Sequence, residues 1–404
     1  MGHVTVALFV MLCVICTALF FDFTNGFHDT GNAVASSIAT GALKPKTAVA
    51  LAAVMNLLGA FLSVAVALTV TNSVVKIQGD DGAPIPELIG NNGEKLLVIV
   101  LAGLIGAILW NMFTWLLGLP SSSSYALLGG IIGSTLAARG ASGLKWVGDG
   151  TKIDGIVGKI LIPAVLSPLI AGVIAMIGCW VVMKFATGAN EKRSHEGFKW
   201  GQIGAASLVS LAHGTNDAQK TMGVITLGLI AYGSWTATDA VPLWVKFVCA
   251  LAIASGTYLG GWRIIRTLSK GLVEISRPQG MAADGASAAV ILAASHLGVP
   301  LSTTQVASGS IMGSGVGRPG AQVRWSVAGR MVVAWVTTLP AAGLIGALMY
   351  GIAAGLPGAV GPIVIMVLLI VGALWMFARS RVHKVDHHNV GEIWEGAPSV
   401  RKAK

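Results

Sequence analysis

Acidic side chains within otherwise apolar segments are the first candidates for chemistry in this sequence. Most of the 17 Asp and Glu residues fall in polar stretches, but four lie in apolar runs, namely Asp22, Asp29, Asp217 and Asp284. A carboxylate at the centre of a membrane helix costs at least about 2.5 kcal/mol, so such a group usually has a function and a partner. The alternative is a structural carboxylate that neighbouring backbone groups satisfy. This alternative stays open for Asp22 and Asp284.

The segments around the other two acids resemble each other. Residues 25–32 (NGFHDTGN) align with 213–220 (HGTNDAQK), sharing Gly and Asp. Residues 118–124 (GLPSSSS) align with 298–304 (GVPLSTT) at nearly the same offset. Two weak matches in the same order rarely arise by chance. The sequence therefore predicts an internal duplication in which each copy carries one functional acid.

Both acidic segments contain residues with poor helix propensity. Gly, Asn and Thr occur beside the acids, so we expect broken helices near 25–32 and near 213–220. Unwound carbonyls and half-helix ends can hold ions at the bilayer midplane. The polar residues that complete this cluster are His28, Asn32, Asn216 and Lys220. Because histidine changes its charge near neutral pH, His28 is a candidate proton carrier, with helix capping as an equal alternative.

The segments 118–124 and 298–304 are suited to bind an oxyanion. Each places Gly, Pro and hydroxyl residues just before an apolar run that should start a helix. Helix N-termini offer free N–H groups and a positive dipole end, which suit a tetrahedral oxyanion. N-capping alone explains one hydroxyl per helix but not four consecutive serines. The candidate anion-binding residues are Ser122, Ser123, Ser124, Ser302, Thr303 and Thr304.

Membrane-spanning helices must position these residues. The 404-residue chain is 54% hydrophobic and 11% charged, whereas soluble domains carry roughly 25% charged residues. Several stretches approach or exceed the roughly 20 apolar residues that cross a bilayer, and they are 47–70, 96–117, 160–183, 327–350 and 362–377. This composition excludes a soluble domain and predicts an all-α integral membrane protein. The apolar run 4–21 lacks a basic leader and a cleavage site, so we expect it to be retained.

Neither the cysteines nor the net charge indicates a further ligand or binding partner. The four cysteines lie in apolar runs, where a thiol behaves as a small hydrophobe, so no disulfide, metal site or cofactor is expected. The net charge of +10 is spread over short loops, as the cytoplasmic bias of Lys and Arg produces. We interpret it as a signal of topology and expect no nucleic acid partner.

The same bias predicts that the two halves run in opposite directions. The loops placed inside carry Lys and Arg, and they are 185–200, 263–281 and 379–404. The loops placed outside are acidic or lack Lys and Arg, and they are 71–95, 231–241 and 351–361. These assignments agree only if the segments around Pro120 and Pro300 are re-entrant hairpins, which is the inverted-repeat plan. The basic loop 138–159 fits poorly outside.

Four parts follow from this topology. The first inverted repeat, with a hairpin at 96–137, occupies residues 1–184. The second, with a hairpin at 282–315 and a final span, occupies 201–378. A cytoplasmic connecting loop (185–200) and a polar cytoplasmic tail (379–404) complete the chain.

Taken together, the motifs resemble the inorganic phosphate transporter (PiT) family. The resemblance rests on 22–30 (DFTNGFHDT), 213–217 (HGTND) and 294–304 (ASHLGVPLSTT), and it covers nearly the whole chain in the family's order. It implies a symporter that imports inorganic phosphate by alternating access. By the same resemblance, the coupling cation binds at Asp29, Asn32 and Asp217, and the hairpin hydroxyls bind phosphate.

The similarity is to the bacterial low-affinity phosphate permease branch, which implies a multi-pass protein of the bacterial inner membrane. The expected partners are inorganic phosphate, free or as a metal-phosphate complex, membrane lipid and a second copy of the chain.

Two departures from the family pattern bear on the coupling ion. Sodium-coupled members tend to have Asn-Asp followed by Asn in both copies, whereas this chain has His28 in one copy and Lys220 in the other. Lys220 lies three residues after Asp217, so the two can pair on a helix and replace the charge of sodium. We therefore expect proton coupling, with sodium as the alternative.

A further departure concerns the hairpins, where family members often have His and this chain has Tyr125 and Gln305. It weakens any inference of a metal-phosphate preference.

Sulfate transport is the closest rival function, although the two acids favour an anion that carries a proton. An anion channel is the rival outside coupled transport. No nucleophile, base and orienting group occur at a recognisable spacing, so an enzyme is not expected.

Overall fold

The structure is a computed structural model that describes residues 2–73, 76, 86–148, 154–186, 191–318 and 323–390. Parts of the loops 71–95 and 138–159 and the tail beyond 390 lie outside the described residues. Apart from one isolated bridge between Val273 and Val323, the regular structure of the described part is helical. The helices are α1 (Gly2–Ala39), α2 (Pro45–Gly59), α3 (Ala65–Ser73), α4 (Pro86–Leu116), α5 (Ser123–Arg139), α6 (Ile162–Ala186), α7 (Glu191–Tyr232), α8 (Leu243–Leu259), α9 (Trp262–Lys270), α10 (Arg277–His296), α11 (Thr303–Val316), α12 (Trp325–Ala354) and α13 (Val360–Ser380).

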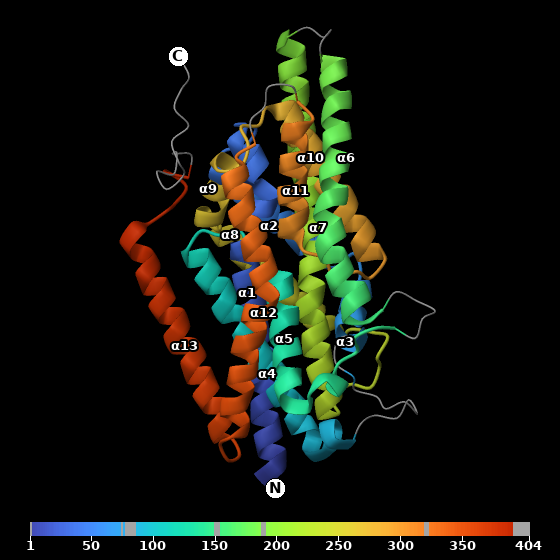
Figure 1. Ribbon diagram of the computed structural model, residues 1–404, viewed down its shortest axis with the longest axis vertical. Helices are drawn as coiled ribbons and strands as arrows, with labels where there is room; N and C mark the ends of the chain where they lie inside the picture. The colour runs from blue at the N-terminus through green and yellow to red at the C-terminus, as the bar shows by residue number, and fades with distance from the viewer. Residues whose placement is uncertain are drawn as a thin grey trace.

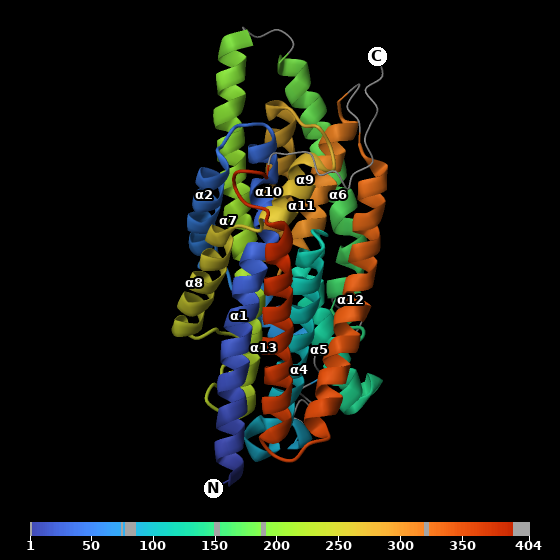
Figure 2. The ribbon, with the colours of Figure 1, turned by 90° about the vertical axis from the view of Figure 1, so that its left-hand side faces the viewer.

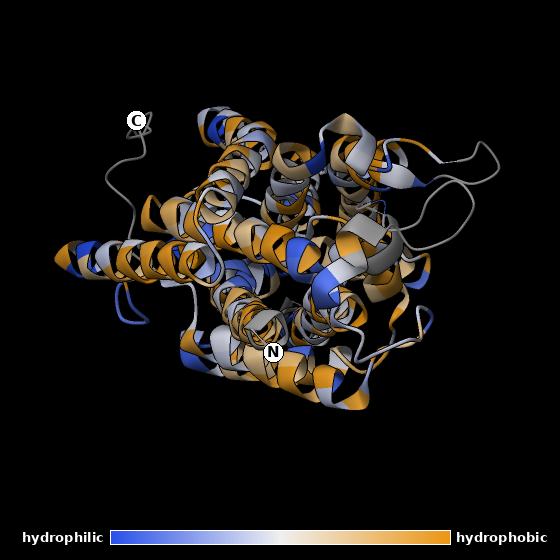
Figure 3. Cartoon of the chain, turned by 90° about the horizontal axis from the view of Figure 1, so that it is seen from below, coloured by the Kyte–Doolittle hydropathy of each residue, from blue (hydrophilic) through white to orange (hydrophobic). Residues whose placement is uncertain are grey.

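These helices form an elongated bundle (Figures 1 and 2). Within the described residues, five helices are long and apolar enough to cross a membrane, or six if the bent pair α8 and α9 counts as one span. Seen along the bundle, hydrophobic residues dominate the peripheral helices (Figure 3). Large apolar side chains on that rim are exposed, for example Leu344 at 73% and Val336 at 70%. An aliphatic exterior of this extent suits hydrocarbon and confirms the predicted all-α membrane class.

Two helical pairs point at each other from opposite ends of the bundle. The pair α4–α5 lies in the lower half of Figure 1 and the pair α10–α11 in the upper half. Each pair turns at a glycine with positive φ, Gly118 (67°) or Gly298 (65°), which ends the first helix as only glycine readily can. The second helix then starts at the hydroxyl run. Both tips therefore meet near the middle of the molecule.

The structure contradicts the expected helix breaks. Residues 25–32 and 213–220 are helical and lie inside the continuous helices α1 and α7. Their glycines serve close packing instead, because a Cβ on Gly26 would meet the Ile253 backbone of α8, and one on Gly214 would meet the Asn56 backbone of α2. Tertiary packing thus overrides the weak helix propensity. These two segments therefore present polar side chains from intact helices and not an opened backbone.

The structure adds two details to the predicted boundaries. The connecting loop 185–200 is shorter than expected, since α6 ends at Ala186 and α7 begins at Glu191. Part of the polar tail folds back on the protein, where Val390 is buried and His387 lies 6.1 Å from the Trp262 ring. The polar sequence showed no sign of this contact, because Val390 is the one buried apolar side chain among the tail residues that the structure describes.

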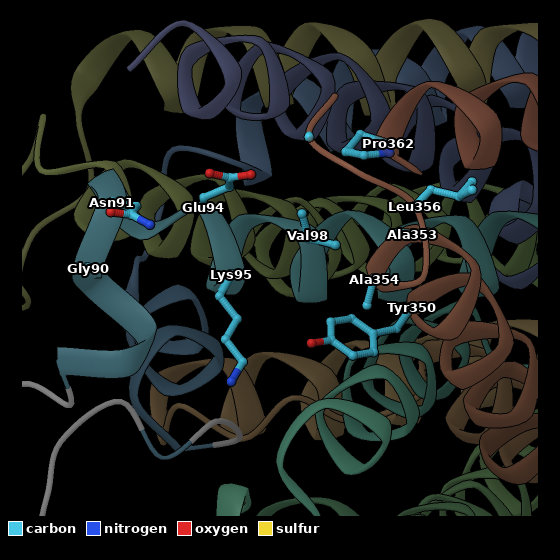
Figure 4. Close-up of a pocket in the computed structure, with 11 residues that line it drawn as sticks. Gly90, Asn91, Glu94, Lys95, Val98, Tyr350, Ala353, Ala354, Leu356 and Pro362 are labelled. Carbon is cyan, nitrogen blue, oxygen red and sulfur yellow. The ribbon is translucent and has the colours of Figure 1, made fainter. Parts of the chain in front are cut away.

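A cavity of about 560 Å³ lies between α4, α12 and α13 (Figure 4). Glu94, Lys95 and Tyr350 line it, beside a left-handed turn at residues 91–93 from which the long span of α4 departs. None of the candidate site residues lines this cavity. It is therefore separate from the site where the hairpin tips meet.

Glycine contacts also fasten the α4–α5 pair to α12, which gives a stability prediction. A Cβ on Gly133 of α5 would collide with the backbone of Gly343 on α12. We expect Gly133→Ala to lower the free energy of unfolding by about 1–3 kcal/mol, the usual cost of overpacking. Thermal unfolding in detergent measures this loss. Gly329→Ala on α12, where a Cβ would meet nothing within 4 Å, is the matched control, and equal melting temperatures for both variants would contradict the prediction.

Candidate functional site

The candidate residues converge where the two hairpin tips meet the middle of α1 and α7. Asp29 on α1 and Asp217 on α7 are buried, at 1% and 0% exposure. The hydroxyl residues at the starts of α5 and α11 are buried with them. Segments about 190 residues apart in the chain are therefore brought into one enclosed polar cluster. In an apolar bundle, such a cluster is stable only if its members satisfy one another.

On the α1 side, Asp29 is held by its neighbour and by the second hairpin. His28 Nδ1 lies 2.6 Å from Asp29 Oδ1. The Thr304 hydroxyl donates to the same carboxylate oxygen at 3.4 Å, and Asn32 Nδ2 donates to Thr304 Oγ1 at 2.9 Å. His28 Nε2 faces the Thr114 hydroxyl at 3.3 Å. The α1 motif thus contacts both hairpins.

On the α7 side, Lys220 is the centre of the contacts. Its ammonium, at 0% exposure, donates to Asp217 Oδ1, as the three-residue spacing predicts. It also donates to Ser124 Oγ at 2.6 Å and to the Leu301 carbonyl at 3.0 Å. One ammonium therefore joins α7 to both hairpin tips.

The six candidate anion-binding hydroxyls divide into two groups. Ser122 and Ser302 cap their helices, accepting from the backbone N–H groups of Tyr125 and Gln305 at 3.2 Å. The other four face the charged cluster. Thr303 Oγ1 donates to Asp217 Oδ2 at 3.0 Å, and Ser123 Oγ lies 3.4 Å from His28 Nδ1, while Ser124 and Thr304 make the contacts given above.

Asn216 lies beside this cluster and faces the second hairpin. Its Nδ2 donates to Ser295 Oγ at 2.9 Å and to the Val299 carbonyl at 3.4 Å. Its buried Oδ1 has no hydrogen-bond partner within the described residues, and the same holds for Asn32 Oδ1. Both amides therefore keep one acceptor free.

Sequence reasoning missed several members of the site. His213 Nε2 lies 3.0 Å from Asp217 Oδ2, and its ring also contacts Asn56 on α2. One ligand atom each of Asp29, His213 and Asp217 lies within 4.8 Å of the others. The spacing of four residues before Asp217 on a helix could have indicated His213. Asn56 and Thr114 lie in other helices, and no local pattern pointed to them.

The two remaining buried acids have different surroundings. Asp284 on α10 accepts from the Ser36 hydroxyl of α1 through both carboxylate oxygens, at 2.6 and 2.5 Å. This contact ties α10 to α1. Asp22 is at 0% exposure, and neither of its oxygens has a hydrogen-bond partner within the described residues.

Charge balance decides what the cluster can bind. Ionised Asp29 and Asp217 bring two negative charges, and Lys220 brings one fixed positive charge. Burial makes the remaining negative charge costly unless a cation or a proton joins the site. A proton on His28 or His213 can supply that charge, and so can a small coupling cation.

Comparison with known proteins agrees with this arrangement. A model of the Phosphate transporter family matches residues 25–346. The chain is 56% identical over 390 residues to a "Probable low-affinity inorganic phosphate transporter" of Mycobacterium bovis, covering 96% of this chain and 88% of the relative. A protein of the same name from Bacillus subtilis is 42% identical over 340 residues, which is 84% of this chain and 96% of the relative.

A solved structure shares the fold. It is described as "The sodium-dependent phosphate transporter", and it matches with a TM-score of 0.74 at 19% identity, covering 86% of this chain and all of that one. The predictions of a transporter and not an enzyme, and of a multi-pass bacterial membrane protein, are confirmed. The chain belongs to the phosphate transporter family.

Proposed function

We propose that this protein imports inorganic phosphate by proton-coupled symport with alternating access. One observation carries the proposal, namely that the buried Lys220 ammonium contacts Asp217, Ser124 of one hairpin tip and Leu301 of the other. An anion bound between the tips would meet that ammonium, and the same ammonium neutralises one of the two acids. Substrate binding and charge balance therefore share a single group.

Phosphate would bind between the starts of α5 and α11. Both helix N-termini direct their positive dipole ends at the meeting point of the tips. Ser123, Ser124, Thr303 and Thr304 would exchange their present partners for phosphate oxygens, with Asn32 and Asn216 beside them. The family assignment and the names of the relatives support phosphate as the substrate.

The proton would offset the charge that phosphate brings. Two carboxylates against one lysine already leave the empty site short of positive charge, and an anion increases the deficit. Because the fixed ammonium of Lys220 stands beside Asp217 and offsets only one carboxylate, at least one mobile positive charge must be bound. His28 and Asp29, 2.6 Å apart, are suited to hold it as a proton.

The opposed hairpins support an inverted repeat. The two tips reach the site from opposite ends of the bundle (Figure 1). Rocking of one pair against the other would open the site to one side at a time. The C-terminal end of α6 and the N-terminal end of α7 lie at the upper end of Figure 1, which we propose to be cytoplasmic, and the α12–α13 turn lies at the lower end.

Tyr125 and Gln305 stand where family members often have histidine, and this difference bears on whether the protein carries free phosphate or a metal-phosphate complex. Tyr125 and Gln305 line an apolar cavity of about 720 Å³ with residues of α6 and α12. Neither position offers imidazole to a metal. We therefore propose free phosphate, and not a metal-phosphate complex, as the carried species.

Uptake of labelled phosphate into proteoliposomes tests this function. With pH and sodium gradients imposed separately, we expect an inward proton gradient to drive accumulation and a sodium gradient alone to drive none. The reason is the fixed charge of Lys220, which takes the place of a sodium ion. Accumulation driven by sodium would establish the sodium-coupled alternative, flux insensitive to both gradients would indicate an anion channel, and strong inhibition by excess sulfate would overturn the phosphate assignment.

A further inference from the structure

An apolar groove between α6 and α12 takes no part in the proposed transport steps. Its volume is about 720 Å³, and α11 lies between the two helices and forms its floor (Figure 1). Aliphatic, glycine, proline, methionine and tryptophan residues line it, with Tyr125 and Gln305 as the two exceptions. Both exceptions are almost fully buried, and Tyr125 Oη and Gln305 Oε1 lie below the surface. An occupant of the groove therefore meets an apolar wall.

The groove opens on a face of the molecule that is suited to lipid. Its rims are exposed apolar side chains, Val165 and Leu169 on α6 and Val336 on α12. The spans that contain them, Val157–Lys184 and Trp325–Ala354, are long and apolar enough to cross a membrane, and only 22% and 33% of their most apolar stretches are buried. Membrane lipid is therefore the solvent at the opening of the groove.

Neither water nor empty space suits this lining. A buried water needs about two to four polar partners, which an apolar wall does not offer. An unfilled space leaves the lining atoms without partners on one side, so their van der Waals contacts are lost. A hydrocarbon chain supplies those contacts and needs no hydrogen bond. The lining therefore favours a hydrocarbon occupant.

The length of the groove suits one acyl chain. Its lining follows α12 from Trp325 to Leu339, which is about 21 Å at a helical rise of about 1.5 Å per residue. A lipid acyl chain spans half of the hydrocarbon core, or about 15 Å. Trp325, at the start of α12, is 67% exposed, and tryptophan is enriched at membrane–water interfaces. A lipid with its headgroup beside Trp325 would therefore lay one chain along the floor of the groove.

The groove also separates the two parts of the bundle that carry the hairpin tips. One part contains α12, which packs against α4 and α5, and the other contains α6, which packs against α10 and α11. The two packing contacts are built alike, because a Cβ on Gly133 of α5 would meet Gly343 of α12, and a Cβ on Gly313 of α11 would meet Gly172 of α6. An occupant that contacts α6, α11 and α12 therefore touches both parts at once.

We infer that the groove binds one acyl chain of a membrane phospholipid, which fills the seam between the two parts that carry the hairpin tips. The chain lies against Met312 of α11 and reaches the level of Tyr125 and Gln305, near the starts of α5 and α11. Because van der Waals contacts alone hold it, the chain can change shape when one hairpin pair moves against the other. This lipid site goes beyond the proposed transport and is compatible with either coupling ion.

Photolabelling in proteoliposomes tests the inference. The probe is phosphatidylglycerol with a diazirine in one acyl chain, added to vesicles of phosphatidylethanolamine and phosphatidylglycerol, and mass spectrometry of peptides identifies the labelled residues. We expect Met312 to be labelled, because it is the half-buried residue of the otherwise buried stretch 303–315 and lines the groove.

Two variants that fill the groove from opposite walls make the test specific. Val332→Trp on α12 and Leu169→Trp on α6 each add a ring to its lining. We expect labelling of Met312 to fall by about tenfold or more in both variants, because the added ring overpacks the groove. The matched controls are Leu344→Trp and Ile177→Trp, which add the same ring at exposed sites of the same two helices outside the groove and should keep wild-type labelling.

Several results would overturn the lipid site. One is a wild-type protein in which exposed residues such as Leu344 are labelled and Met312 is not. Another is equal labelling of Met312 in the filling variants and their controls, and Leu169→Trp alone decides this comparison if Val332→Trp fails to fold. Disulfide formation between two copies that carry Val332→Cys would show that a second copy of the chain covers the groove instead. Labelling needs no phosphate gradient, so these outcomes are independent of the proposed function.

Discussion

Replacing Asp217 by asparagine is expected to reduce phosphate accumulation by about 100-fold or more, while the protein still folds. Asparagine keeps the shape but removes the anion that faces both Lys220 and His213. Breaking a buried charge pair by removing one partner costs roughly 3–5 kcal/mol of stability, and a 100-fold loss of accumulation requires only that about 2.8 kcal/mol of this cost fall on the states that bind substrate and proton. Asp29→Asn should act similarly through its contacts with His28 and Thr304. Proteoliposome uptake under a pH gradient measures the loss.

Folding must be controlled separately, because both acids are buried. Size-exclusion profiles and melting temperatures in detergent distinguish a misfolded variant from an inactive one. Asp239→Asn makes the same chemical change on an exposed loop and should accumulate phosphate normally. Full activity in both Asp29→Asn and Asp217→Asn would remove these acids from the mechanism.

Several contacts of the candidate site could be predicted because two pairs of short motifs resemble each other in the same order. The equivalence of the two acids and of the two hydroxyl tips, read from short motifs, indicated which segments must meet. The structure brings Thr304 to Asp29 and Thr303 to Asp217. The contact between Asp217 and Lys220 followed from helical spacing alone. Sequence spacing was enough to predict a contact wherever both residues lay in the same motif.

The expected helix breaks show where local rules fail. Gly26 and Gly214 lower helix propensity, but in the structure each admits the backbone of a neighbouring helix. Propensity cannot distinguish a glycine that breaks a helix from one that allows close packing, since the difference lies in the partner helix. Asn56 was missed for a similar reason. Its contact with His213 spans 157 residues, and no motif near Asn56 in the sequence indicated that its side chain would reach the candidate site.

The hydroxyl residues at the tips fall into two groups, helix caps and residues that face the charged cluster, and the motif alignment alone did not separate them. Four consecutive serines exceeded what capping requires, which correctly suggested a surplus. Ser122 and Ser302 act as caps, whereas their successors turn toward the charged cluster. Helical rotation decides this division, because successive residues at a helix start point about 100° apart. Ser122 and Ser302 occupy aligned positions in the two similar motifs, and the same division is found at both helix starts.

Replacing Lys220 by asparagine is expected to remove proton coupling, with a loss of pH-driven accumulation of about 100-fold. Lys220 is at 0% exposure and has three acceptors, so its loss leaves Asp217, Ser124 and the Leu301 carbonyl without their shared donor. Two buried carboxylates then lack any fixed positive charge, which costs several kcal/mol unless another cation enters. Asparagine offers an amide oxygen, a suitable ligand for a small cation.

Uptake by the Lys220→Asn variant should therefore respond to a sodium gradient that leaves the wild type unaffected. Separately imposed pH and sodium gradients measure both responses in one preparation. Lys199→Asn is the matched control, since Lys199 also lies on α7 but pairs with Glu196 at 3.9 Å on the surface, where an ion pair is worth at most about 1 kcal/mol. Unchanged pH behaviour in Lys220→Asn would show that the ammonium is structural, and the missing positive charge would then have to come from the histidines alone.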